Sequence, residues 1–430
     1  MTTNEIAPQP LNQFRNNAKM IPQAELGWRA LSQEGLIGIK VAFGGSNDRL
    51  ITNTGHTFAN FCTCSYLGLN GHPKLLQGAI AALQEAGTIS LSLAELRIRL
   101  SILDRMEQEL ADLFGGPVLP GVTCSALTAG ILPLVASGHL SEPTTGRTSD
   151  VRPRVMVFDK FAHFSMAYMK PVCADETQVL TIPHNDLDAL EAICRKYPRV
   201  AFVCDGAYST GGAADVVGLK LLQDRYGLFI FADDSHSLSV LGQRGEGYVR
   251  ARLDMNPLTL IVASLGKAFG TAGGIAMLGA KEHLDFLYRY AGPVGWSQNM
   301  EVPAIGSSLA SIALHRTPEL GELQAKLRDN IRLFDQQIET EQKGTKLPLK
   351  MIHVGEQSDA LHLAKELYRR GYYTSAVFFP MVPRGKAGIR IMLRADMERA
   401  TLQGFIDNLR EIMNDLAARR ATTATGALVS

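Results

Sequence analysis

The middle of the chain alternates short apolar runs with amphipathic stretches. The runs are rich in Val, Ile, Leu and Phe, which is typical of strands covered on both faces, and the stretches between them have the spacing of crossover helices. This alternation predicts an α/β fold built on a mostly parallel sheet. Strands are expected at 154–158, 200–204, 228–232, 259–263 and 275–278.

The texture changes at about Ser311, where longer helical patterns replace the strand-like runs. Near the C-terminus, apolar residues recur at helical spacing and predict one buried helix face: Leu402, Phe405, Ile406, Leu409, Ile412 and Met413. We therefore predict an N-terminal arm and small-domain segment at 1–70, a large domain at 71–310 and a small C-terminal domain at 311–430. The polar stretch 141–153, SEPTTGRTSDVRP, is expected to be a surface loop.

Composition narrows the classes of function. The 430 residues carry 43 basic and 42 acidic side chains, a net charge of +1, so neither a nucleic-acid partner nor a polybasic membrane anchor is expected. The polar opening and the absence of a long apolar run predict a cytoplasmic protein without a membrane span. Six scattered cysteines favour reduced thiols, and no metal site is expected.

Polar side chains follow four of the predicted strands. Ligands of open parallel sheets bind beyond the carboxyl ends of the strands, so these side chains are the first candidates for a site. The segments are DKFAHFS with His163, DGAYSTGG with Ser209, DDSHSL with Asp233 and His236, and SLGKAFG with Ser264 and Lys267. Each residue alone has an ordinary structural explanation, and only their combination indicates chemistry.

That combination suits pyridoxal 5'-phosphate (PLP), an aldehyde cofactor that stabilises negative charge on its substrate. Lys267 is predicted to form the Schiff base with the aldehyde, since an amine in a partly buried site loses its proton readily. Asp233 is predicted to keep the ring nitrogen protonated. His163 is expected to stack on the ring and His236 to reach the ring oxygen.

The cofactor phosphate needs backbone N–H groups and hydroxyls. The run GVTCSALTAGIL is a turn that enters an apolar helix, and the N-terminus of a helix favours anions. Ser125 and Ala126 are the predicted donors there, and Ser264 is expected to add a hydroxyl.

Six motifs between about Phe61 and Met413 together resemble the α-oxoamine synthase family of PLP-dependent enzymes. They read CSYLGLNGHP, FAHFS, DGAYSTGG, DDSHSLSVLGQRGEG, SLGKAFG and VPRGKAGIRIML. The resemblance implies fold type I, with a mostly parallel seven-stranded sheet in the large domain and a smaller α+β C-terminal domain. It also implies a decarboxylative condensation of an α-amino acid with an acyl thioester, carried on coenzyme A or an acyl carrier protein, to give an α-amino ketone.

The resemblance also implies roles for individual residues. It implies the same roles for Lys267, Asp233, His163 and His236 as those given above, and it implies that Ser209 contacts the cofactor. Arg390 falls on the arginine that holds the amino-acid carboxylate, a task that suits a planar guanidinium. In WSQNM, Ser297 and Gln298 match residues that reach the cofactor phosphate of a partner subunit, which implies a homodimer with shared active sites.

One departure concerns the substrate side. Family members usually have an Asn just before the Tyr-Leu-Gly step, whereas Cys64 and Ser65 stand there in this chain, so these two residues are expected to line the substrate pocket. Two alternatives to the synthase stay open. The first is another PLP enzyme, an aminotransferase or a lyase, since these enzymes use the same lysine and aspartate. The second is a non-catalytic PLP-binding partner subunit, which the retained Lys267 disfavours.

Overall fold

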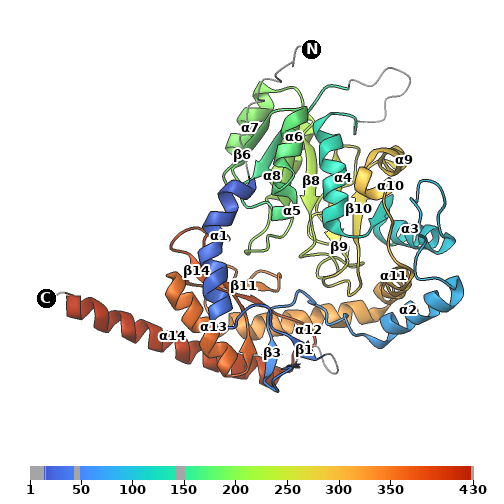
Figure 1. Cartoon of the computed structure of the whole chain (residues 1–430). Coiled ribbons are helices and arrows are strands. Elements are labelled where there is room, and N and C mark those ends of the chain that lie inside the picture. Colours follow the sequence, from blue (N-terminus) through green and yellow to red (C-terminus); the bar gives the residue numbers. More distant parts are fainter. Residues whose placement is uncertain (1–13, 15, 43–48, 141–150, 428–430) are drawn as a thin grey trace, which may run out of the picture.

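A seven-stranded sheet forms the centre of the larger part of the protein (Figure 1). The computed structural model describes residues 14, 16–42, 49–140 and 151–427. The strand order is β4-β10-β9-β8-β7-β5-β6; β6, β5, β7, β8 and β9 are parallel, and β10 is antiparallel to both β9 and β4. The strands are β4 Val118–Gly121, β5 Val155–Asp159, β6 Val179–Ile182, β7 Val200–Asp205, β8 Phe229–Asp233, β9 Thr259–Ser264 and β10 Gly274–Leu278. The predicted fold class is confirmed.

Helices cover both faces of this sheet, which explains the continuous apolar runs. On β8, Ile230 and Ala232 pack into the core with α3, α7, α8 and α11, whereas Phe229 and Phe231 face α4, α6 and α9. The helices of this part are α2 Pro73–Ala86, α3 Ser101–Phe114, α4 Cys124–Ala136, α5 Phe164–Ala167, α6 Lys170–Glu176, α7 Leu187–Lys196, α8 Val216–Tyr226, α9 Lys281–Tyr290, α10 Gly292–Gly295 and α11 Val302–His315.

The five strands predicted from the sequence are confirmed to within about one residue at each end. Two strands of the seven-stranded sheet were missed, and both lie at its edges. β4 contains Pro120 and ends in Gly121, a pair typical of turns, and Pro is tolerated in a strand mainly at a sheet edge. β6 exposes Thr181 and therefore lacks the continuous apolar run of a central strand.

Two smaller sheets, the first helix and the last three helices make up the second part. The order is β1-β2-β3-β12 in one sheet and β11-β14-β13 in the other. Phe61, just after β3, stacks on Phe405 of α14 with ring centroids 4.0 Å apart, so the segment before residue 70 packs with the C-terminal residues. The elements are α1 Asn16–Gln33, β1 Val41–Ala42, β2 Arg49–Thr52, β3 Thr57–Asn60, α12 Pro318–Asp335, β11 Leu349–Gly355, α13 Gln357–Arg369, β12 Tyr372–Tyr373, β13 Ser375–Val377, β14 Ala387–Met392 and α14 Arg399–Ala427.

The apolar stripe predicted near the C-terminus is confirmed, since Leu402, Phe405 and Leu409 of α14 are fully buried. The division into domains stays a prediction. The predicted loop at 141–153 lies mostly outside the described residues. Among the described helices, none combines the length and the apolar character that a membrane crossing needs.

Two glycines bring distant segments together beside β9. A Cβ on Gly274 of β10 would lie 2.3 Å from the backbone N of Cys124, so only glycine lets the start of α4 approach the sheet here. Gly270 has a φ of +84°, and a Cβ there would lie 2.3 Å from Leu69. The segment around residue 69 and the N-terminus of α4 therefore both adjoin the loop that follows β9.

His315, the last residue of α11, gives the protein a predicted acid sensitivity. Its Nδ1 lies 2.7 Å from the Ser311 carbonyl and its Nε2 lies 2.8 Å from the Ser239 hydroxyl. Burial lowers the pKa of His315 to about 4, below the 6.5 of the unfolded chain. A depressed folded-state pKa contributes stability that is complete above pH 6.5 and is lost as the pH falls toward 4.

We expect the free energy of unfolding to fall between pH 7 and pH 4 by about 3 kcal/mol more in the wild type than in His315→Gln. Urea unfolding at three pH values within this range measures the difference. Equal pH dependence in the two proteins would contradict the assignment.

Candidate active site

Because β5, β7, β8 and β9 are parallel, the loops that follow them all lie at the carboxyl ends of the strands, on the same side of the sheet (Figure 1). The strands end in Asp159, Asp205, Asp233 and Ser264. Asp205 and Asp233 are direct partners in the register of β7 and β8, and both are buried. Two carboxyl groups are therefore neighbours where ligands of such sheets bind.

Lys267 stands at this edge in contact with a histidine. Its Nζ lies 3.0 Å from His236 Nε2, and the hydroxyl of Tyr66 lies 2.6 Å from His236 Nδ1. Burial, reinforced by the charge of Lys267, holds the pKa of His236 well below its usual range. A neutral imidazole has one donor and one acceptor. Nε2 therefore accepts from the Lys267 Nζ, and Nδ1–H donates to the Tyr66 hydroxyl.

Asp233 is fixed by the loop that follows it. The backbone N–H of Ser235 donates to Oδ1 over 3.0 Å, and the thiol of Cys124 lies 3.7 Å from Oδ2. Burial, together with the charge of Asp233, raises the pKa of the Cys124 thiol well above its usual range, so the thiol keeps its proton. The Ser235 hydroxyl in turn accepts from the Ser264 N–H over 2.8 Å and ties the ends of β8 and β9 together.

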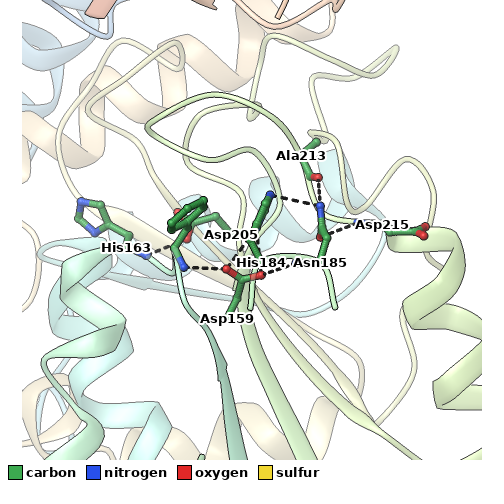
Figure 2. A network of polar contacts seen from close by, with 8 residues as sticks. Asp159, His163, His184, Asn185, Asp205, Ala213 and Asp215 are labelled. Atoms are coloured by element: carbon green, nitrogen blue, oxygen red, sulfur yellow. Dashed lines mark hydrogen bonds and ion pairs between the residues drawn. The ribbon is translucent and has the colours of Figure 1, made fainter. Parts of the chain in front are cut away.

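His163 begins the short helix α5 and is exposed. Its backbone N–H donates to Asp205 Oδ2 over 2.8 Å, and its ring points away from the polar network around Asp159 (Figure 2). Desolvation by surrounding protein lowers the pKa of His163; Asp233 opposes this, whereas Lys267 and Arg390 add to it. The His163 ring is therefore in the electrostatic field of the predicted site residues.

Asp205 is buried at the end of β7, beside Asp233. Burial, with the negative charge of Asp233 second, raises the pKa of Asp205 well above its usual range. Two like charges at adjacent buried positions do not both ionise easily. The Asp205 carboxyl therefore holds its proton more readily than an exposed carboxyl does.

The predicted phosphate donors lie at the start of α4. Thr123 caps this helix, and its hydroxyl accepts the Ala126 N–H over 3.0 Å. Ser125 is exposed. The Ser264 hydroxyl, half-buried at the end of β9, accepts the Gly266 N–H over 3.2 Å. The helix N-terminus and the end of β9 are joined through Cys124 and Ser235, whose Sγ and Oγ are 3.8 Å apart.

Arg390 enters the same region from the second part of the protein. It is half-buried on β14, and its Nη1 donates to the Ser209 carbonyl over 3.3 Å. Its Nε and the Ser65 hydroxyl are buried without a hydrogen-bond partner among the described residues. Burial raises the pKa of Tyr66 well above its usual range, and the neighbouring, half-buried Cys64 adds to this effect. The structure thus brings Cys64, Ser65, Ser209 and Arg390 toward the lysine.

Ser297 and Gln298 are exposed on the segment between α10 and α11. In the part of the chain that the structure describes, no hydrogen bond joins either residue to the Lys267 group. They are the two predicted site residues that this subunit does not gather around the lysine.

Sequence reasoning missed several residues of the site: Tyr66, Cys124, Asp205 and Ser235. Tyr66 and Asp205 lie inside quoted motifs. Asp205 directly follows a predicted strand, so the rule that ligands bind at strand ends could have identified it as a candidate. Cys124 and Ser235 also lie inside quoted runs, but nothing in the sequence indicated their roles, because these depend on contacts with segments 109 and 29 residues away.

The chain is similar in sequence to known proteins over most of its length. The family described as aminotransferase class I and II matches residues 166–409. An 8-amino-7-oxononanoate synthase from Marinomonas sp. is 26% identical over 362 residues, covering 83% of this chain and 86% of that protein. A 2-amino-3-ketobutyrate coenzyme A ligase from Salmonella typhimurium is 28% identical over 349 residues, covering 78% and 82%.

Solved structures agree in fold. A serine palmitoyltransferase from S. paucimobilis, with PLP and myriocin bound, superimposes with a TM-score of 0.79 at 16% identity, covering 95% of this chain and 100% of that one. An 8-amino-7-oxononanoate synthase from Francisella tularensis gives a TM-score of 0.67 at 18% identity, covering 83% and 98%. The resemblance to α-oxoamine synthases is confirmed, and the chain belongs to the aminotransferase class I and II family.

Proposed function

We propose that this protein is a PLP-dependent acyltransferase that condenses an α-amino acid with an acyl thioester. The products are an α-amino ketone, carbon dioxide and the free thiol. The observation that carries the proposal is the Lys267 amine in contact with a neutral His236, beside the buried Asp233 and within reach of the charge of Arg390. The named relatives include enzymes of this reaction type, which supports the same choice.

The donor set at the strand edge fits PLP. Asp233 Oδ1 already accepts one N–H. Among the described residues, the only donor to Oδ2 is a thiol 3.7 Å away, a weak donor, so Oδ2 keeps the capacity to accept the proton of a ring nitrogen. Lys267 would hold the aldehyde, His236 the ring oxygen and the start of α4 the phosphate. When bound, PLP supplies an electron-withdrawing ring that stabilises negative charge at the α-carbon of an amino acid.

The residues around it have distinct tasks. Arg390 binds the amino-acid carboxylate, using a guanidinium whose Nε has no hydrogen-bond partner among the residues that the structure describes. The Lys267 Nζ takes the proton from the α-carbon and later returns one. The Ser165 N–H donates to His163 Nδ1 over 3.3 Å, so a neutral His163 carries its proton on Nε2 and can donate to the oxygen of the attacked thioester.

The proposal includes a homodimer. Ser297 and Gln298 are exposed rather than turned to this subunit's own lysine, which suits residues that contact a partner's cofactor phosphate. The cytoplasm stays the predicted location.

Incubating the purified protein and PLP with mixed amino acids tests the function, with and without mixed acyl-CoA and acyl carrier protein thioesters. We expect carbon dioxide and an α-amino ketone, both dependent on the thioester, identified by mass spectrometry. Carbon dioxide release without any thioester would count against the synthase. Transfer of the amino group to an added 2-oxo acid would instead identify an aminotransferase.

A further inference from the structure

A buried carboxylate outside the proposed cofactor contacts anchors the loops around the site. Asp159, at the end of β5, accepts the Phe161 N–H over 2.7 Å, the Asn185 N–H over 3.1 Å and the His184 Nδ1–H over 3.1 Å (Figure 2). Burial alone raises the pKa of Asp159, but these hydrogen bonds, that of His184 foremost, outweigh burial and lower it. The group is therefore a carboxylate that holds the loops after β5 and β6.

Asn185 continues the network to the loop after β7. Its Nδ2 donates to the Ala213 carbonyl over 3.0 Å, and its Oδ1 accepts the Asp215 N–H over 3.3 Å. Its φ of 54° lies in the left-handed region, which few residues other than glycine adopt and which Asn tolerates best. The backbone thus takes a costly conformation at the position where the side chain links two loops.

His184 connects Asp159 to the side chain of Asn185. With its Nδ1–H committed to Asp159, its Nε2 is an acceptor, and the Asn185 Nδ2 lies 3.3 Å from it. The ring also meets Tyr208 edge-on, with centroids 4.4 Å apart. We name Asp159, His184 and Asn185 the Asp159 clamp.

The clamp ends on two elements of the proposed site. On one side, Asp159 fixes Phe161, two residues before His163. On the other, Asn185 holds Ala213, which pairs with Ala207 across the turn that carries Ser209. The Ser209 carbonyl is in turn the acceptor for Arg390. The clamp therefore joins three loops, one of which carries His163 and another the carbonyl that Arg390 contacts.

We propose that the Asp159 clamp consists of positioning residues that set the affinity for the amino-acid substrate, by holding the Ser209 carbonyl against Arg390 and the loop of His163 in place. This inference rests on the proposed function and deepens it. The clamp residues are not among the predicted cofactor and substrate contacts, and they act through the loops they join.

Asn185→Gly isolates one end of the clamp. Glycine adopts a φ of 54° without cost, so the backbone N–H to Asp159 is kept while the side-chain bonds to Ala213 and Asp215 are lost. We expect amino-acid binding to the holoenzyme to weaken about tenfold, seen in the amino-acid-induced change of cofactor absorbance, with kcat at saturation within about twofold. Combined with Arg390→Lys, the two losses are expected to be less than additive.

Hydrogen exchange gives a readout that does not depend on activity. In Asn185→Gly, with or without cofactor, amide exchange across 207–215 is expected to accelerate. His184→Phe keeps a ring beside Tyr208 but removes the hydrogen bond to Asp159, and it is expected to accelerate exchange across 160–165 as well. Unchanged exchange in both variants overturns the clamp.

Asp186→Ala is the matched control. Asp186 caps α7 by accepting the Ala189 N–H over 2.9 Å, so its loss removes a neighbouring hydrogen bond outside the clamp. We expect a lower melting temperature with unchanged amino-acid affinity. Wild-type affinity in Asn185→Gly, or an equal loss in Asp186→Ala, would overturn the proposal. If no amino acid changes the cofactor absorbance of the wild type, the proposed function fails. Hydrogen exchange still shows whether the Asp159 clamp holds the loops.

Discussion

Lys267→Ala is expected to lose the visible absorbance of the lysine-linked cofactor and to lower the rate of ketone formation by about 10³-fold or more. The physical reason is that the Nζ beside His236 both holds the aldehyde and moves the α-proton, and a positioned general base alone contributes about 10² to 10⁴-fold. Absorbance spectra, product assays and melting curves on the same preparation measure the effect. Because the side chain is only half-buried, the melting temperature should stay within about 2 °C of the wild type.

Lys160→Ala is the control for that experiment, since Lys160 is an exposed lysine on the loop after β5. It should leave absorbance and rate at wild-type values. Borohydride reduction of the wild type, followed by peptide mapping, should tag Lys267. A tag on another lysine, or colour and turnover retained in Lys267→Ala, would refute the assignment.

Asp233→Asn is expected to lower kcat by roughly 10² to 10³-fold, the usual effect of removing one preorganised electrostatic group. The amide keeps an oxygen that can accept the Ser235 N–H, so the fold is retained. It lacks the negative charge that keeps a ring nitrogen protonated, so stabilisation of charge on the amino acid is lost. Single-turnover exchange of the α-proton, monitored by NMR in deuterated water, measures the affected step directly.

Asp234→Asn supplies a neighbouring buried control. Asp234 accepts the Val249 N–H over 2.9 Å and bonds to the Ser237 hydroxyl, contacts that stabilise the loop after β8. The substitution places an amide against these donors, so stability should fall by about 1–3 kcal/mol while kcat stays near the wild type. If Asp233→Asn proved no slower than Asp234→Asn, Asp233 would have no role at the ring nitrogen.

The sequence by itself determined the central architecture and the chemistry at the ends of its strands. Buried parallel strands must be apolar along their whole length, so the runs around Val203 and Phe231 were visible without a structure. The polar residues that follow them face one edge because parallel strands share a direction. Lys267 and Asp233 were therefore candidates from the local sequence, whereas the edge strand with Pro120 carried a turn-like pattern and was missed.

Only the tertiary structure decided which distant groups meet. Tyr66 reaches His236 across 170 residues, Arg390 reaches Ser209 across 181, and Cys124 reaches Asp233 across 109. The Asp159 clamp likewise joins three loops that no spacing rule connects. Such contacts depend on how whole layers pack and on close approaches such as that of α4 to Gly274. A single sequence encodes periodicity and strand-end chemistry locally, but the partners of a side chain are fixed by the packing of segments that are far apart along the chain.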